Sequence, residues 1–156
     1  MSSAQKKILT LCVVHTKDRI LLGMKKRGFG EGRWNGFGGK VEKGESIANA
    51  AKRELQEEAG IVPHDLQRRG VLNFTFMGDS IPPLKVYVFS ANSFSGEPAE
   101  SDEMSPRWFS HADIPFNDMW PDDQYWLPKV LAGKNIEGTF HFKDTNTIIS
   151  YDIQEL

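Results

Sequence analysis

Apolar and polar residues alternate over most of the chain in a way that predicts a fold built mainly of strands. The first two apolar runs are separated by the turn residues 16–18, and the third and fourth by the Gly- and Pro-containing segment 78–83. Both spacings are typical of hairpins. The runs that predict strands span residues 8–14, 19–24, 71–77, 84–89, 107–109, 136–142 and 148–153.

One long helix is predicted between Ser46 and Gly60. Ser46 is a favoured N-cap residue, and the alanines that follow are strong helix formers. Gly60 stands where a left-handed residue would end the helix. A second, shorter helix is expected after residue 122, running to about residue 132.

The carboxylates of the long helix are badly placed for a helix that only has to be stable. Glu54, Glu57 and Glu58 crowd its last turn, where the helix dipole disfavours negative charge. Glu54 and Glu58 also form a like-charge i,i+4 pair, and no Lys or Arg lies three or four positions from either to relieve it. A single row of the helix carries Ile47, Ala51, Glu54 and Glu58.

That row begins apolar and ends acidic, which predicts carboxylates carried into a partly buried site. Unpaired buried charge is costly, so a bound cation is expected there. Because the ligands are oxygens, Mg²⁺ fits best and Mn²⁺ is the alternative. A solvated acidic helix end is the competing interpretation.

Two further segments carry candidate binding residues. The glycine-rich, basic segment 25–33 is predicted to be a loop, whose cations either are solvated or meet phosphates, with Lys25 the preferred phosphate contact. The second segment places Trp120 just before Asp122 and Asp123. The two acids either form the negative first turn of a helix or, with Trp120, form a pocket for a purine base. Phe74 and Phe76 share one strand face, which suits either the core or a pocket floor.

Composition narrows the class of protein. The 156 residues suit one domain, 1–156, and the net charge of −2 gives no general basic surface for a nucleic acid polymer. The only cysteine, Cys12, lies in an apolar run and excludes an intramolecular disulfide. No apolar run reaches membrane-spanning length. We expect a cytoplasmic monomer that acts on a small molecule and binds no membrane, with additional nuclear or mitochondrial pools left open.

The segment 39–61 resembles the Nudix box, G-x5-E-x7-R-E-U-x-E-E-x-G-U, where U is aliphatic. Every specified position is met, which makes chance agreement improbable. The family hydrolyses nucleoside diphosphates linked to another group and uses a divalent metal held by the box glutamates. The matching residues are Gly39, Glu45, Arg53, Glu54, Leu55, Glu57, Glu58, Gly60 and Ile61.

Segments 22–30, 32–40, 101–104 and 119–123 resemble the eukaryotic MutT-type branch of this family, which hydrolyses oxidised purine nucleoside triphosphates such as 8-oxo-dGTP. The resemblance implies an α/β Nudix fold, a mixed sheet sandwiched between helices. It implies metal binding by Glu54, Glu57, Glu58, Glu103 and the carbonyl of Gly38, and phosphate contacts from Lys25 and Lys40. The implied base pocket and other substrate contacts are Thr10, Phe29, Asn35, Phe37, Gly38, Gly39, Phe74, Met104, Trp120, Pro121, Asp122 and Asp123, with Leu84 where the family carries a methionine.

The implied reaction is metal-assisted attack of water on phosphorus, which releases pyrophosphate and a nucleoside monophosphate. Glu58 or a neighbouring carboxylate would orient or deprotonate the attacking water, and Asp123 is a further candidate for this role. Three alternatives stay open. They are a Nudix enzyme for another nucleoside diphosphate derivative, a non-catalytic domain that binds oxidised purines, and a structural domain.

Overall fold

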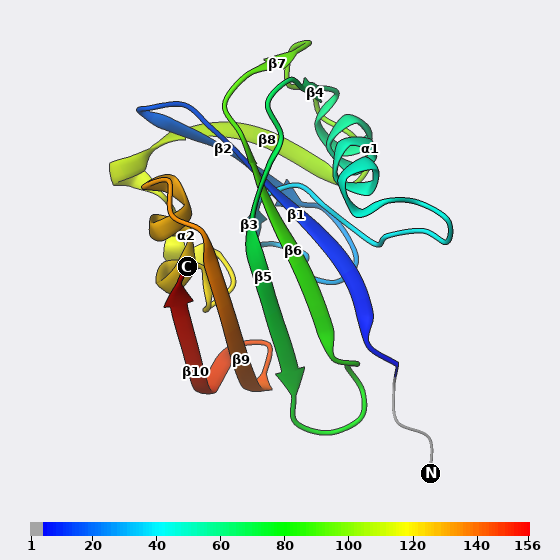
Figure 1. Cartoon of the computed structure of the whole chain (residues 1–156), viewed down its shortest axis with the longest axis vertical. Helices are drawn as coiled ribbons and strands as arrows, with labels where there is room; N and C mark the ends of the chain where they lie inside the picture. Colours follow the sequence, from blue (N-terminus) through cyan, green and yellow to red (C-terminus); the bar gives the residue numbers. More distant parts are fainter. Residues whose placement is uncertain (1–4) are drawn as a thin grey trace.

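A computed structural model of the chain describes residues 5–156 as a mixed β-sheet with helices on both faces (Figure 1). The helices are α1 (Ile47–Ala59) and α2 (Asp123–Leu131), with 3-10 turns η1 (His111–Asp113) and η2 (Phe116–Asp118). The strands are β1 (Lys7–His15), β2 (Arg19–Lys25), β3 (Trp34–Asn35), β4 (Val62–Pro63), β5 (Gln67–Phe76), β6 (Leu84–Ala91), β7 (Phe94–Ser95), β8 (Met104–Ser110), β9 (Ile136–Asp144) and β10 (Thr147–Glu155).

The main sheet has eight strands in the order β10-β9-β5-β6-β1-β2-β3, and β8 pairs with β2 outside this path. β1 lies parallel to β6 and β5 parallel to β9, whereas the other pairs are antiparallel. The two predicted hairpins, β1–β2 and β5–β6, are therefore confirmed. β4 and β7 form a separate two-stranded sheet.

Helix α1 begins and ends where its capping residues predict. The Ser46 side chain accepts a hydrogen bond from the backbone N–H of Asn49 at 3.1 Å. Gly60 has a left-handed φ of 72° and donates its N–H to the carbonyl of Gln56. Only glycine adopts this conformation without strain, so the chain leaves the helix directly after the box acids.

Side chains alternate between the two faces of the sheet and build a separate core on each. Along β1, Cys12 and Val14 pack with α1, whereas Val13 between them packs with α2. The same alternation continues on β2, where Ile20 and Leu22 face α2 and Leu21 faces α1. This is the period-2 pattern of a sheet covered on both faces.

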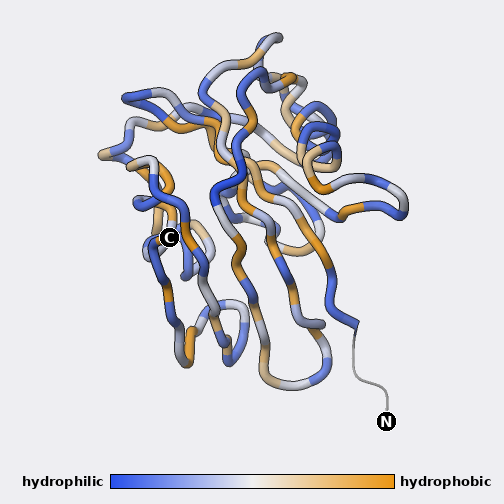
Figure 2. Tube along the Cα trace, in the orientation of Figure 1, coloured by the Kyte–Doolittle hydropathy of each residue, from blue (hydrophilic) through white to orange (hydrophobic). Residues whose placement is uncertain are grey.

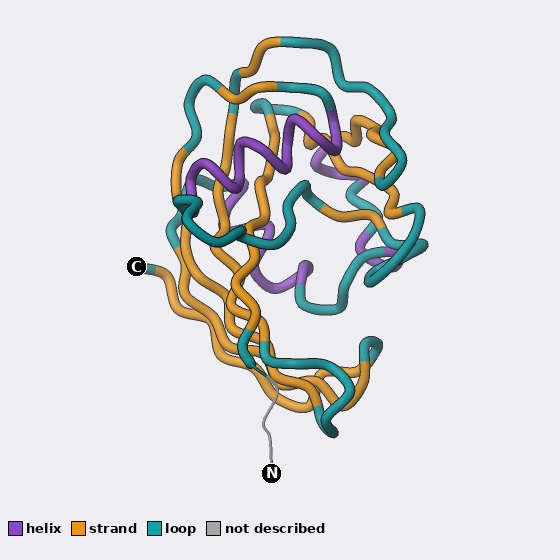
Figure 3. The backbone as a smooth tube through the Cα atoms, turned by 90° about the vertical axis from the view of Figure 1, so that its right-hand side faces the viewer, coloured by secondary structure: helices purple, strands orange, loops and turns teal. Residues whose placement is uncertain are grey.

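Apolar and polar residues are distributed along the trace as a sheet covered on both faces requires. In Figure 2 the long strands carry mixed apolar and polar positions, and several connecting turns are strongly polar. Figure 3 shows the molecule from the side, with the helices in its upper part and the ends of the long strands below. Within the described residues, no helix is both long enough and apolar enough to cross a membrane.

Several elements extend beyond their predicted bounds. β5 begins at Gln67 rather than residue 71, with a register shift between Arg68 and Gly70. β8 begins at Met104 rather than residue 107. The three two-residue strands β3, β4 and β7 were not predicted, because two residues carry no periodicity.

Candidate active site

A cavity of about 220 Å³ lies between the end of α1, the inner strands and the start of α2. Glu58 and Lys25 line one end of it, and Trp120, Asp122 and Asp123 line the other. Twelve of the predicted site residues meet here. They are Thr10, Lys25, Phe29, Asn35, Gly38, Gly39, Glu58, Phe74, Met104, Trp120, Asp122 and Asp123.

Glu58 is the most buried acid at the α1 end, with 5 % of its surface exposed. Its Oε1 accepts a hydrogen bond from the backbone N–H of Gly38 at 2.8 Å. Burial raises the pKa of Glu58 to about 8, and the nearby Glu54 carboxylate adds to the rise. Burial also raises the pKa of Glu54.

Two glycines let the box loop approach these acids closely. A Cβ on Gly39 would lie 2.6 Å from the carboxyl carbon of Glu54, and a Cβ on Gly38 would lie 1.8 Å from the carbonyl oxygen of Thr10. Neither separation is possible for real atoms, so larger residues would push the loop away from α1 and β1. The loop backbone therefore lies directly against the carboxylates.

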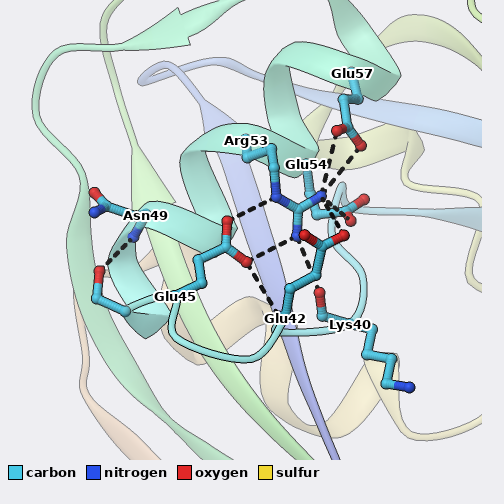
Figure 4. Close-up of polar contacts among 8 residues, drawn as sticks. Lys40, Glu42, Glu45, Asn49, Arg53, Glu54 and Glu57 are labelled. Atoms are coloured by element: carbon cyan, nitrogen blue, oxygen red, sulfur yellow. Dashed lines mark hydrogen bonds and ion pairs between the residues drawn. The ribbon is translucent and has the colours of Figure 1, made fainter.

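Arg53 binds the other acids of the box together (Figure 4). Its Nε lies 2.7 Å from Glu45, and one terminal nitrogen lies 2.8 Å from Glu54 and 3.3 Å from Glu57. Hydrogen bonds from Arg53 lower the pKa of Glu45. Glu54 therefore does have a cation beside it, but that cation comes from the adjacent Arg53 and not from a residue three or four positions away. Among the described residues, Glu58 forms no salt bridge.

The acids at the α2 end are buried more completely. Asp122 is 3 % exposed and accepts a hydrogen bond from the Trp126 indole at 2.8 Å. Asp123 is 2 % exposed, and its Oδ2 has no hydrogen-bond partner among the described residues. Burial raises the pKa of Asp122 to about 6 and raises that of Asp123 well above its usual range, with a further rise from Asp122. Asp123 does open α2, but it is not a solvated first-turn acid.

Aromatic and unpartnered polar groups complete this end of the cavity. The Phe29 and Trp120 rings lie 5.0 Å apart, and Phe74 and Phe76 line the cavity while also packing in the α2-side core. The hydroxyl of Thr10 is buried without a hydrogen-bond partner among the described residues. A Thr hydroxyl within a strand commonly bonds to the backbone, but this one does not. The free hydroxyl of Thr10 lines the same cavity as Asp123.

Comparison with known proteins agrees with this architecture. The NUDIX domain profile matches residues 6–130. The chain belongs to the Nudix family. It is 51 % identical to the oxidized purine nucleoside triphosphate hydrolase of Mus musculus over 150 residues, and the match covers 96 % of each chain.

Other Nudix proteins show the same relationship. The oxidized purine nucleoside triphosphate hydrolase of Danio rerio is 48 % identical over 96 % of each chain. The crystal structure of the MutT protein from Bacillus halodurans superposes with a TM-score of 0.83 at 29 % identity, covering 95 % of this chain and 97 % of that one. The chain has the Nudix fold, as the sequence predicted.

Six predicted residues of this Nudix protein do not line the cavity. Phe37 is fully buried on the α1 side of the sheet, because its position opposite Cys12 turns it toward that core. Lys40 is exposed, and in Figure 4 its side chain points away from the acids, while its carbonyl accepts from Arg53 at 3.1 Å. The structure thus gives no support to direct substrate contact by either residue. The other four are Glu54, Glu57, Glu103 and Pro121.

Glu103 acts on the cavity through Lys25. Its two carboxylate oxygens bind Lys25 at 3.2 Å and Arg27 at 2.8 Å, which lowers the pKa of Glu103. The ammonium group of Lys25 is thereby held at the cavity wall. Glu57 is exposed and tied to Arg53, so only Glu58 among the box glutamates lines the cavity itself.

Sequence reasoning missed the two arginines that organise the site. Arg53 is a Nudix-box position, and its i,i+4 spacing from Glu57, typical of a helix ion pair, is the signal that could have identified its role. The four-residue spacing between Asp122 and Trp126 offered the same kind of signal for the hydrogen bond that they form. Arg33, described below, had no such signal, since its partners are distant in the sequence.

Proposed function

We propose that this Nudix hydrolase converts oxidised purine nucleoside triphosphates, such as 8-oxo-dGTP and 2-hydroxy-dATP, to the monophosphate and pyrophosphate. The observation that carries the proposal is a single cavity with two different ends. One end pairs a buried carboxyl of the Nudix box with a lysine, and the other combines Trp120 with two buried aspartates. The names of the mouse and zebrafish relatives support the same substrate class.

A divalent metal ion suits the acidic end, and Nudix hydrolases in general need one. The donors available there are oxygens, which favour Mg²⁺, with Mn²⁺ as the alternative. We propose that Glu54, Glu57, Glu58, Glu103 and the carbonyl of Gly38 hold it. With a pKa near 8, Glu58 is fully ionised at neutral pH only beside a cation. The described residues contain no preformed cluster of three or more His, Cys, Asp or Glu groups, and three of the box glutamates are bound to Arg53.

The bound metal would neutralise phosphate charge and lower the pKa of the attacking water. The protein's own groups position the substrate around it. Lys25, fixed by Glu103, presents its ammonium group to the phosphates. Glu58, at the same wall of the cavity, is the carboxylate that we assign to orient the water or accept its proton.

The base end supplies stacking and hydrogen bonding. Trp120 and Phe29 offer apolar ring faces, and the free oxygens of Thr10 and Asp123 offer partners for base edges. Because Asp122 and Asp123 are adjacent and have raised pKa values, one can be protonated while the other is ionised. The pair can therefore donate or accept, which supports broad selectivity among oxidised purines.

A pyrophosphate-release assay over a panel of triphosphates tests the proposal. The purified chain should release pyrophosphate from 8-oxo-dGTP and 2-hydroxy-dATP with Mg²⁺, and much more slowly from dGTP and dATP. Nucleotide sugars and dinucleoside polyphosphates should be poor substrates. Tight binding of oxidised purines without metal-dependent release would identify a binding domain instead, and preference for another nucleotide would identify a different Nudix activity.

A further inference from the structure

A second hollow lies next to the base pocket, and Trp120 lines both. The rest of its wall comes from the loop at residues 28–33, from Asn117 and Asp118 of η2, and from the turn between β9 and β10 at Thr145 and Asn146. Phe29 and Gly30 also line both hollows, so Trp120 belongs to a wall that the base pocket shares with this second hollow, which we call the outer hollow.

Arg33 covers the indole from the outer hollow. The guanidinium carbon lies 4.3 Å from the centre of the Trp120 ring, a cation–π distance. Arg33 lines the outer hollow and is absent from the wall of the base pocket. Within the base pocket the same ring has Phe29 as its aromatic neighbour, at 5.0 Å between ring centres.

The guanidinium is itself held in place. One terminal nitrogen donates to the side-chain oxygen of Asn146 at 2.5 Å, and the Asn146 backbone N–H in turn donates to Asp144 at 2.8 Å. The loop is shaped for this contact, since Gly30 has a left-handed φ of 88° and accepts from the Arg33 N–H at 3.1 Å. Trp120 is therefore tied through Arg33 to the turn between the last two strands.

The positive charge of Arg33 also acts on the acid pair. It lowers the pKa of Asp122, against the larger effect of burial, and the Trp126 indole N–H and the Asp123 side chain lower it as well. Of these side chains, only Arg33 carries a positive charge, and it lies outside the base pocket.

We propose that Arg33 is a positioning residue for base recognition, which fixes the Trp120 indole for stacking on the purine and ties it to Asn146. This inference rests on the proposed function, because it takes a purine to be the ligand that Trp120 contacts. Stacking of a cation on an exposed indole is worth a factor of about two to five in an equilibrium constant. Arg33 lines no part of the phosphate end, so the chemical step should be affected little.

Two variants of Arg33 and one control distinguish its contact with the Trp120 ring from the effect of its positive charge on Asp122. Arg33→Met should weaken binding of 8-oxo-dGMP about two- to fivefold by calorimetry and leave kcat within about twofold. Arg33→Lys keeps the charge but not the planar stack, so it should lose affinity yet retain the wild-type Asp122 titration. Arg68→Met is the matched control, because Arg68 stacks on Tyr87 at 4.2 Å and lines neither hollow.

The titration is measured by NMR on the Asp122 carboxyl in ligand-free protein. Arg33→Met should raise its pKa, which loss of packing alone would not do. If Arg33→Met matches Arg68→Met in both affinity and titration, the inference is overturned. A wild-type protein that releases no pyrophosphate from any oxidised triphosphate would reject the proposed function, whereas the monophosphate affinity and the titration would still decide the role of Arg33.

Discussion

The two ends of the cavity both carry clustered acids, but they stabilise them by opposite means. At the α1 end, Arg53 lies among Glu45, Glu54 and Glu57 and supplies positive charge to each. At the α2 end, Asp122 and Asp123 are nearly inaccessible and have raised pKa values, so protonation relieves the charge there. The first arrangement offsets the negative charge with a neighbouring cation, and the second keeps at least one of the two aspartates neutral.

This difference assigns different chemistry to the two ends. Anionic oxygens suit a divalent metal and the phosphates that it binds. A neutral carboxyl beside an ionised one suits the donors and acceptors of a purine edge. Glu58 is intermediate, since it is buried like the aspartates but belongs to the Nudix box and faces Lys25. The substitutions below test whether the ends are in fact separable.

The largest effect is expected from Glu58→Gln. The amide keeps the shape of the side chain but cannot carry charge to a metal or accept a proton, so kcat should fall by about 10²–10⁴-fold. Melting temperature should hold or rise, because an isosteric neutral group replaces a buried acid. Pyrophosphate release and thermal denaturation measure the two quantities, with the exposed Glu137→Gln as control. An unchanged rate would remove Glu58 from the mechanism.

Asn substitutions at the α2 end should change selectivity more than rate. Loss of a buried hydrogen-bond partner costs about 1–3 kcal/mol, so Asp123→Asn should lower kcat/KM for its best substrate about 10- to 100-fold. Asp122→Asn should change the ratio of kcat/KM for 8-oxo-dGTP to kcat/KM for 2-hydroxy-dATP in a different way from Asp123→Asn, because Trp126 already binds Asp122. Parallel kinetics on both substrates measure this. Identical ratios in the two variants would contradict the idea that the pair reads the base.

Removal of the Arg53 guanidinium should reduce stability and kcat through the α1 end and leave base binding at the α2 end unchanged. Arg53→Met leaves three glutamates without their shared partner, which should reduce stability by about 1–3 kcal/mol and kcat about tenfold. Affinity for 8-oxo-dGMP without metal should stay within about twofold of wild type. Lys52→Met, an exposed neighbour on the same helix, serves as control. A large loss of monophosphate affinity would show that the ends are not independent.

The pH dependence of stability distinguishes the ends more finely. A carboxyl whose pKa is raised in the folded state contributes stability below its unfolded pKa and loses it as the pH rises through the folded value. For Asp122 this window runs from about pH 4 to about pH 6. Asp122→Asn should therefore gain about 5 °C in melting temperature relative to wild type between pH 4 and pH 7. A constant difference would contradict the raised pKa.

Local patterns predicted the elements well and their non-local pairing poorly. The capping residues set the ends of α1, and alternating residues located the long strands, because both signals lie within a few neighbouring positions. The parallel pairs β1–β6 and β5–β9 join segments far apart in the chain, so no local pattern indicates them. The site divides in the same way. Its acids and tryptophan stood out by residue type, whereas the contacts of Arg33 and Glu103 depend on the tertiary fold.

The position of a residue within a sequence motif also predicted its place in the site less well than its structural surroundings did. Phe37 and Lys40 lie in the loop that resembles the family, yet strand alternation turns Phe37 into the core, and the Lys40 side chain points away from the acids. Leu84 lines the cavity where the family carries a methionine, which the resemblance anticipated.

The most direct test of the two-ended cavity is calorimetric titration of metal-free protein with 8-oxo-dGMP and with dGMP. These ligands lack the pyrophosphate group, so they report on the base end alone. We predict that 8-oxo-dGMP binds at least about tenfold more tightly than dGMP, because one buried hydrogen bond is worth about 1–3 kcal/mol, while pyrophosphate release from 8-oxo-dGTP still requires added Mg²⁺. Equal affinity for the two monophosphates, or discrimination that arises only with metal, would contradict it.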